Sequence, residues 1–153
     1  MTSLRKILHR NEIAFGYRIG YLFNHFAGPV YKWTVAEMGL HRPEFAAMFC
    51  ADHLEDATAS DVVLLTGIPK NSVSRAVSKL IAEGLMATET DVTDGRRSFL
   101  RLTPKGQKIY ASILPRFRER QEQMVSVLTA AERAEFNRLL NKLVERDDDW
   151  AKG

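Results

Sequence analysis

The stretch GIPKNSVSRAVSKLIAEGL, residues 67–85, decides the fold. Four of its apolar side chains recur at helical spacing, which predicts a helix with one buried stripe. These are Val73, Val77, Leu80 and Ile81. The opposite face is polar, small and cationic, and it carries Asn71, Ser74, Arg75 and Ser78. We expect this helix to end at Gly84.

A second, shorter helix is expected just before it. Thr58 and Asp61 form a capping-box-like start ahead of the apolar residues 62–65, and Gly67 ends the helix. Two short helices joined by a turn that contains glycine make a helix-turn-helix, whose second helix can enter the major groove of DNA. The alternative is an amphipathic surface helix without that role.

The charges are unevenly distributed. The chain has a net charge of only +3, but residues 69–108 hold eight basic and four acidic side chains. A basic excess in one compact segment is typical of nucleic-acid binding, because each neutralised phosphate releases counterions. A solvated surface is the alternative interpretation.

A β-hairpin is expected after the second helix. Residues 85–90 and 98–103 have strand-like composition, and Leu100 and Leu102 alternate with Phe99 and Arg101. The loop between them is DVTDGRR, residues 91–97. Thr103-Pro104 is a cap followed by a first-turn proline, which predicts a further helix directly after the hairpin.

Together these segments resemble the winged helix-turn-helix of the MarR family of bacterial transcription regulators. The wing pattern Asp-x-x-Asp-x-Arg, ending in Leu-Thr-x-x-Gly, is matched in register by Asp91, Asp94, Arg96, Leu102, Thr103 and Gly106. The resemblance extends from about Gly39 to the C terminus and includes LTAAE, residues 128–132. It implies a mainly α fold with a small β wing, and a homodimer whose two winged lobes grip duplex DNA.

The resemblance also implies roles for the wing. Arg96 would reach into the minor groove, and Asp94 would hold it in place. Asp91 is expected to fix the turn through an Asx-type hydrogen bond, and Arg97 to add a phosphate contact. The candidate DNA-binding residues are Lys70, Asn71, Ser72, Ser74, Arg75, Ser78, Lys79, Arg96 and Arg97.

The terminal segments are expected to form the dimer. We divide the chain into N-terminal dimerisation helices at 1–38, the DNA-binding lobe at 39–103 and C-terminal dimerisation helices at 104–153. Apolar stripes run along both terminal segments, and a shared intersubunit core is favoured over packing within one monomer. One stripe joins Ile109, Ile113 and Phe117 to Met124 and Leu128, and the other holds Phe136, Leu139, Leu140, Leu143 and Val144. Pro29 should kink or break the first helix and Pro115 should kink a later one.

An aromatic cluster in the first helices is a candidate effector pocket. Aromatic walls with one cation would suit a small aromatic carboxylate or its acyl conjugate. Core packing is the commoner role for such a stripe. The candidate pocket residues are Phe15, Arg18, Tyr21, Phe26, Trp33, His41 and Phe45.

Other functions find little support. No nucleophile with a base, no paired carboxylates and no glycine-rich phosphate loop indicate an enzyme; an architectural or protein-binding winged helix of low sequence specificity is the alternative to a specific regulator. His41, Cys50, Asp52 and His53 match no closed zinc site, and neither a metal nor a cofactor is expected. Cys50, the only cysteine, has apolar neighbours and is expected to be buried. With no apolar run that spans a bilayer, we expect a cytoplasmic protein.

Overall fold

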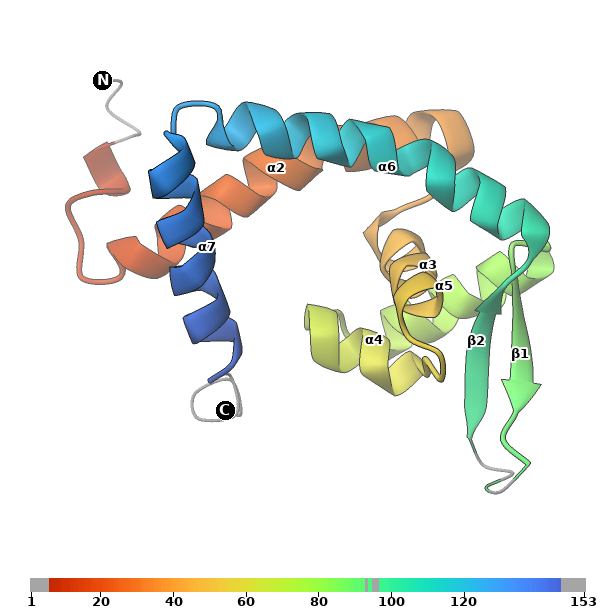
Figure 1. The fold of residues 1–153 in the computed structure, drawn as a ribbon. Helices are drawn as coiled ribbons and strands as arrows, with labels where there is room; N and C mark the ends of the chain where they lie inside the picture. Colours follow the sequence, from red (N-terminus) through yellow and green to blue (C-terminus); the bar gives the residue numbers. More distant parts are fainter. Residues whose placement is uncertain (1–5, 93, 95–96, 147–153) are drawn as a thin grey trace. The chain divides into compact units, whose positions relative to one another are not determined.

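A computed structural model of the chain describes residues 6–92, 94 and 97–146 (Figure 1). Its contacts divide the chain into two units, Met1–Phe117 and Arg118–Gly153. The first unit holds α2 (Ala14–Met38), α3 (Arg42–His53), α4 (Ala59–Thr66), α5 (Lys70–Ala82), β1 (Met86–Thr90) and β2 (Ser98–Leu102). Helix α6 (Pro104–Val125) passes from the first unit into the second, which also contains α7 (Ala130–Val144). The fold is therefore mainly helical with a small β wing, as predicted.

Helix α2 is not interrupted at Pro29, so the predicted break is wrong. The helix continues for two further turns to Gly39, which adopts the left-handed conformation (φ 66°) that ends it. Ala27, Val30 and Thr34 are buried around and after the proline. This packing holds the backbone helical although Pro29 lacks one hydrogen-bond donor. Helix α6 likewise continues through Pro115.

The short helix α4 begins and ends as predicted. Thr58 is its N-cap: the Thr58 N–H donates to Asp61 Oδ2 at 2.8 Å, and the Asp61 N–H donates back to the Thr58 hydroxyl at 3.3 Å. Gly67 ends the helix in the left-handed conformation (φ 64°). Val62, on the inner face, is fully buried. The capping box thus fixes where α4 starts, and so where α5 can follow.

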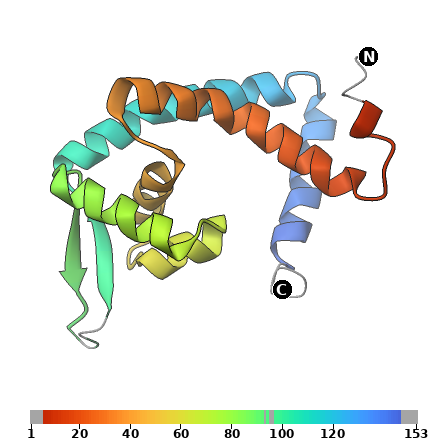
Figure 2. The same cartoon turned by 180° about the vertical axis from the view of Figure 1, so that it is seen from behind.

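Helix α5 packs on α3, α4 and β1, as the reverse view in Figure 2 shows. Its buried stripe is made by Val73, Ala76 and Leu80, with Val77 half-buried. Ile81 was predicted to belong to this stripe, but it is 40% exposed, so that part of the prediction is wrong. The buried stripe is therefore narrower than the apolar pattern of the sequence, with Ala76 between Val73 and Leu80, and α3 is one of the elements packed on α5.

The hairpin is antiparallel, with Met86 opposite Leu102 and Thr90 opposite Ser98. It is attached to the helices at its base. The Leu100 N–H donates to the Ala57 carbonyl at 2.7 Å, and the side chain of Leu100 is 2% exposed. The wing is therefore anchored to the segment between α3 and α4 through Leu100, and it also contacts α5.

The start of α6 packs against the turn between α5 and β1 (Figure 1). Gly106 lies so close to this turn that an added Cβ would be 1.9 Å from the carbonyl oxygen of Leu85. Thr103 caps the helix by accepting the Gly106 N–H at 3.0 Å, and its hydroxyl donates to the Gly84 carbonyl at 2.7 Å. The Thr-x-x-Gly sequence is thus the joint between the wing and α6.

Aromatic rings join α2, α3 and α6 inside the first unit. Phe45 packs against Phe117 (ring centroids 4.7 Å apart), Tyr110 (5.7 Å) and Tyr31 (5.9 Å). Ile113 is fully buried beside them. The stripe predicted for a shared intersubunit core, from Ile109 to Phe117, is therefore packed within the chain, because α3 supplies its partners.

In the second unit, α7 begins at a capping box. The Thr129 N–H donates to Glu132 Oε2 at 2.8 Å, and the Glu132 N–H donates to the Thr129 hydroxyl at 3.3 Å. Arg133 Nη1 lies 3.0 Å from Glu122 Oε2 and links α7 to the end of α6. No described residue of α7 is buried; Phe136 is half-buried, and four apolar side chains are exposed at 38–68%. These are Leu139, Leu140, Leu143 and Val144.

Candidate nucleic-acid interface

The outward face of α5 carries the polar residues expected from the sequence. Asn71, Ser74, Arg75 and Ser78 are all exposed, and Ser72 is half-buried. Val73, Ala76 and Leu80 hold the other side of the helix in the core, so the outward face is fixed in position. A rigid helix that presents hydroxyl, amide and guanidinium groups can donate to and accept from base edges.

The three cations of α5 lie in different surroundings. Lys70 and Arg75 are exposed and have no hydrogen bond or ion pair with any residue that the structure describes. Lys79, in contrast, donates to the carbonyl of Gly39 and lies 3.7 Å from Glu44 Oε1. Lys79 therefore joins the recognition helix to the α2–α3 turn, and its ammonium group points into the lobe.

The wing loop is closed by backbone and carboxylate hydrogen bonds. The Asp94 N–H donates to Asp91 Oδ1 at 3.3 Å, which is the Asx-type bond expected of Asp91. The Asp91 N–H donates to the Arg97 carbonyl at 3.0 Å, and the Arg97 N–H donates to the Asp94 carbonyl at 2.9 Å. Arg97 Nη1 also lies 3.9 Å from Asp91 Oδ2. Arg96 lies outside the described residues.

Arg101 ties β2 to two other segments, and the sequence did not single it out for this. Its Nε donates to Glu89 Oε2 on β1 at 3.0 Å, and its Nη2 donates to Asp56 Oδ1, before α4, at 3.2 Å. The hydrogen bonds that Arg101 donates to Asp56 and Glu89 raise its pKa above the ordinary value. The guanidinium also lies 5.4 Å from the ring centroid of Phe99. Arg101 thus belongs to the structure of the wing.

Comparison with known proteins finds a family that is similar to part of this chain. The sequence profile of the MarR family matches residues 38–97, which include the helix-turn-helix and most of the wing loop. Residues 38–97 of this chain are therefore similar to the MarR family. The transcriptional regulator HosA of Escherichia coli O157:H7 is 28% identical over 116 residues, which cover 74% of this chain and 84% of HosA. HosA is named as a transcriptional regulator.

Solved structures of MarR-family members share the fold. A MarR-family regulator from Silicibacter pomeroyi has a TM-score of 0.77 at 23% identity, with 94% of each chain covered. BpsR of Bordetella bronchiseptica, whose DNA binding is regulated by 6-hydroxynicotinic acid, has a TM-score of 0.69 at 22% identity, with 84% of this chain and 97% of BpsR covered. At such identities the likeness concerns the fold alone.

The structure does not gather the predicted effector residues into one pocket. Phe26 and Phe45 meet at the ring of Phe117. Phe15 is 62% exposed, and Arg18 donates to the carbonyl of Ala14 in its own helix at 3.3 Å. The remaining three lie apart: Tyr21 stacks on His25, Trp33 faces Arg116, and His41 precedes α3.

Sequence reasoning missed Arg116, whose guanidinium lies 3.9 Å from the ring centroid of Trp33. Helical spacing alone gave no reason to pair these residues, which are far apart in the chain. A cation on an indole face can also take a carboxylate at its free edge. Arg116 is thus a second candidate for the cation that Arg18 was expected to supply.

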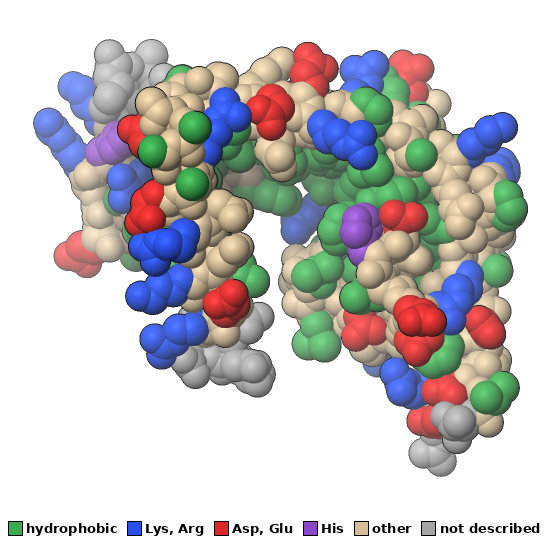
Figure 3. Space-filling model, in the orientation of Figure 1, with side chains coloured by type: hydrophobic (Ala, Val, Ile, Leu, Met, Phe, Trp, Pro, Cys, Tyr) green, Lys and Arg blue, Asp and Glu red, His purple; other side chains and the backbone are tan. Residues whose placement is uncertain are grey.

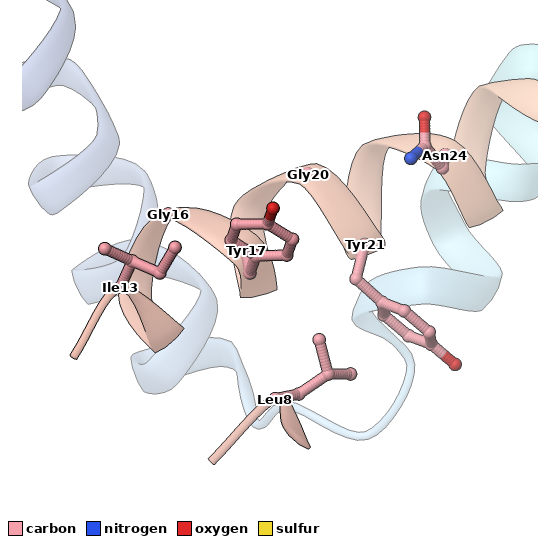
Figure 4. Close-up of a pocket in the computed structure, with 7 residues that line it drawn as sticks. All are labelled: Leu8, Ile13, Gly16, Tyr17, Gly20, Tyr21 and Asn24. Atoms are coloured by element: carbon pink, nitrogen blue, oxygen red, sulfur yellow. The ribbon is translucent and has the colours of Figure 1, made fainter. Parts of the chain in front are cut away.

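A cavity of about 600 Å³ lies along the N-terminal half of α2 (Figure 4). Of the predicted pocket residues, only Tyr21 lines it. A second hollow of about 410 Å³ lies between the ends of α2 and α5 and the start of α6, and it includes Lys105 but also Glu37 and Glu83. The two carboxylates make this hollow a poor site for an anion.

In the described part of the chain, no three His, Cys, Asp or Glu side chains gather as metal ligands would. Cys50 is fully buried, as predicted, and burial together with the Asp61 carboxylate raises the pKa of its thiol. Among the described helices, none has both the length and the apolar composition needed to cross a bilayer.

Proposed function

We propose that this protein binds a pseudo-palindromic operator in cytoplasmic duplex DNA as a homodimer and represses transcription there. The observation that carries the proposal is the division of α5 into two faces. Val73, Ala76 and Leu80 fix one face in the core, and the other presents exposed hydrogen-bonding side chains. Such a helix fits the major groove, where each base pair displays a distinct set of donors and acceptors.

Individual side chains suit individual contacts. The amide of Asn71 can bind an adenine edge and the guanidinium of Arg75 a guanine edge, while Ser74 and Ser78 accept either. Lys70 and the half-buried Ser72, near the start of the helix, are placed for phosphates. We assign Lys79 to the lobe itself, because Gly39 and Glu44 engage its ammonium group.

The wing supplies the second contact. We propose that Arg96 enters the minor groove, with Asp94 holding its guanidinium and Arg97 adding a phosphate contact. The closed loop at Asp91 supports this, because a side chain carried on an ordered turn loses less freedom on binding. The narrow minor groove has an enhanced negative potential that attracts arginine.

Exposed apolar side chains support the homodimer. In the first unit the N-terminal half of α2 exposes Ile13, Phe15, Tyr17, Ile19, Leu22 and Phe23 at 41–63%. In the second unit α7 exposes Leu139, Leu140, Leu143 and Val144. Faces of this size on helices outside the lobe are typical of interfaces between subunits. We therefore propose that residues 1–38 and 104–153 form the dimer and residues 39–103 the DNA-binding lobe.

An aromatic carboxylate is the proposed effector class, and we propose that it releases the DNA. The regulation of BpsR by 6-hydroxynicotinic acid, itself an aromatic carboxylic acid, supports the class. In this chain Trp33 with Arg116 offers an aromatic surface and a cation, the two groups that an aromatic carboxylate requires. Arg18→Ala and Arg116→Ala distinguish the two candidate cations. The variant that lacks the binding cation should lose the response to a panel of benzoates, cinnamates and their coenzyme A thioesters.

Competition binding tests the central proposal. A duplex selected from random sequence, or footprinted beside the chain's own gene, should bind about a thousandfold more tightly than random DNA at one fixed salt concentration. Protection should cover two half-sites about 10 base pairs apart. Equal affinity for all duplexes would favour an architectural protein instead. Sedimentation of a monomer at binding concentrations would refute the homodimer.

A further inference from the structure

A groove between α4 and α5 lies next to the exposed polar face of α5. Its volume is about 250 Å³. Helix α4 forms one wall and the first two turns of α5 form the other. The lining residues are Ala59, Ser60, Val63 and Leu64 from α4, and Lys70 and Ser74 from α5.

Leu64 gives this groove an apolar rim. Its side chain is 82% exposed, whereas Val62 on the inner face of the same helix is fully buried. A single exposed leucine is ordinary on a protein surface. This one is unusual in its position, because Ser74 on the opposite wall belongs to the exposed face of the recognition helix. Figure 3 shows hydrophobic side chains at the surface over α4.

The lining combines three kinds of chemistry. Val63 and Leu64 are apolar, Ser60 and Ser74 carry hydroxyl groups, and Lys70 carries the only charge among the lining residues. An apolar wall beside a lone ammonium group complements a ligand that has an apolar edge and an anion close by. In the major groove the only apolar group on any base edge is the 5-methyl group of thymine, and every base is attached to a phosphate backbone.

We propose that this groove reads thymine: Leu64 and Val63 contact the 5-methyl group of one thymine in each half-site, and Lys70 neutralises a neighbouring phosphate. The inference rests on the proposed function and extends it from α5 to α4. The first helix of the helix-turn-helix then contributes to sequence specificity through an apolar contact. Leu64 becomes a specificity-determining residue, and its partner is a single methyl group.

Deoxyuracil substitution tests this directly, because deoxyuracil pairs as thymine does but lacks the methyl group. Each thymine of an operator selected with the full-length protein is replaced in turn, and the affinity is measured for the wild type, Leu64→Ala and Leu65→Ala. Leu65 is the matched control, since it is adjacent and 61% exposed but does not line the groove. Burial of one methyl group predicts about a fourfold loss of affinity for one thymine per half-site in the wild type and in Leu65→Ala. Leu64→Ala should bind the two duplexes equally.

Each other outcome overturns the inference. If the same thymine is sensitive in Leu64→Ala, the methyl group is read by another residue. If no thymine is sensitive, or if truncating Leu64 leaves operator affinity unchanged, the groove serves a protein or a small molecule instead. Recovery of an operator without a Leu64-dependent thymine would refute this inference alone. Failure to recover any preferred duplex would refute the proposed function and this inference with it. Thermal melting should be unchanged in Leu64→Ala, because the side chain is exposed.

Discussion

Replacing Gly106 by alanine should separate the wing from α6. A Cβ at this position would lie 1.9 Å from the carbonyl oxygen of Leu85 and 2.9 Å from its carbonyl carbon. Both are backbone atoms, so no side chain can rotate away. The same oxygen accepts the Thr103 N–H at 3.1 Å. To reach ordinary van der Waals contact the two segments must separate by roughly 1.5 Å, which stretches this hydrogen bond.

The magnitude follows from two opposing effects. Overpacking a well-packed site typically costs about 1–3 kcal/mol, and the upper end applies here because the obstacle is backbone. Alanine in a helix is favoured over glycine by about 0.5–1 kcal/mol. The net destabilisation should therefore be about 2 kcal/mol. For a chain of this size that corresponds to a fall in melting temperature of about 4–8 °C.

Thermal and urea unfolding, followed by far-UV circular dichroism at one protein concentration, measure the effect. A fixed concentration is required because the stability of a dimer, the state that we propose for this protein, depends on the protein concentration. The matched control is Gln107→Ala, the next residue of α6, whose side chain is exposed. It should stay within about 0.5 kcal/mol of the wild type. If Gly106→Ala is as stable as Gln107→Ala, the joint is not tightly packed and the steric argument is refuted.

Four further changes test the cations and the α4 cap. Arg101→Gln removes the ion pairs with Glu89 and Asp56. It should weaken operator binding but lower the free energy of unfolding by less than about 1 kcal/mol, because both carboxylate partners are exposed. A large fall in melting temperature would contradict this. Lys79→Met should destabilise the fold by about 1–3 kcal/mol, because it leaves a buried carboxylate without its ammonium partner. Arg75→Ala should instead leave the melting temperature unchanged and weaken operator binding by about 1–3 kcal/mol, because it removes a contact with a guanine edge. The reverse pattern in melting and operator-binding measurements would exchange their roles. Hydrogen bonds from Thr58 lower the pKa of Asp61. The stability that they contribute is present above the ordinary pKa of a carboxyl group and is lost as the pH falls through the lowered pKa. Thr58→Ala should therefore lose less stability than the wild type when both are titrated with acid over that range.

Local sequence was sufficient for most of the helix-turn-helix. Glycines at fixed offsets and capping side chains act over four residues or fewer, so Gly67, Gly84 and the Thr58–Asp61 box marked the ends of α4 and α5 correctly. The Asp91 turn was predictable for the same reason. These features depend on the backbone near each residue, and the sequence contains that information.

Contacts between distant segments were not predictable from a single sequence. Lys79 meets Gly39 across 40 positions and Arg101 meets Asp56 across 45, so neither spacing nor periodicity could assign their partners. The break expected at Pro29 failed for a related reason, since packing around Ala27 and Val30 outweighs the local preference of proline. Ile81 has helical spacing but is exposed, because periodicity does not say how far around the helix the tertiary neighbours extend.

These internal contacts change the meaning of the basic segment. The excess of positive charge between residues 69 and 108 indicated nucleic-acid binding, but several of these cations hold the lobe together. Lys79 and Lys105 bind backbone carbonyls, and Arg101 binds two carboxylates. On α5 only Lys70 and Arg75 are left without a partner among the described residues. Because each phosphate contact contributes about 0.9 to the salt slope, binding should depend on salt less steeply than the charge count implies. A larger share of the affinity must then come from contacts with base edges, and the polar face of α5 and the apolar rim at Leu64 are suited to these.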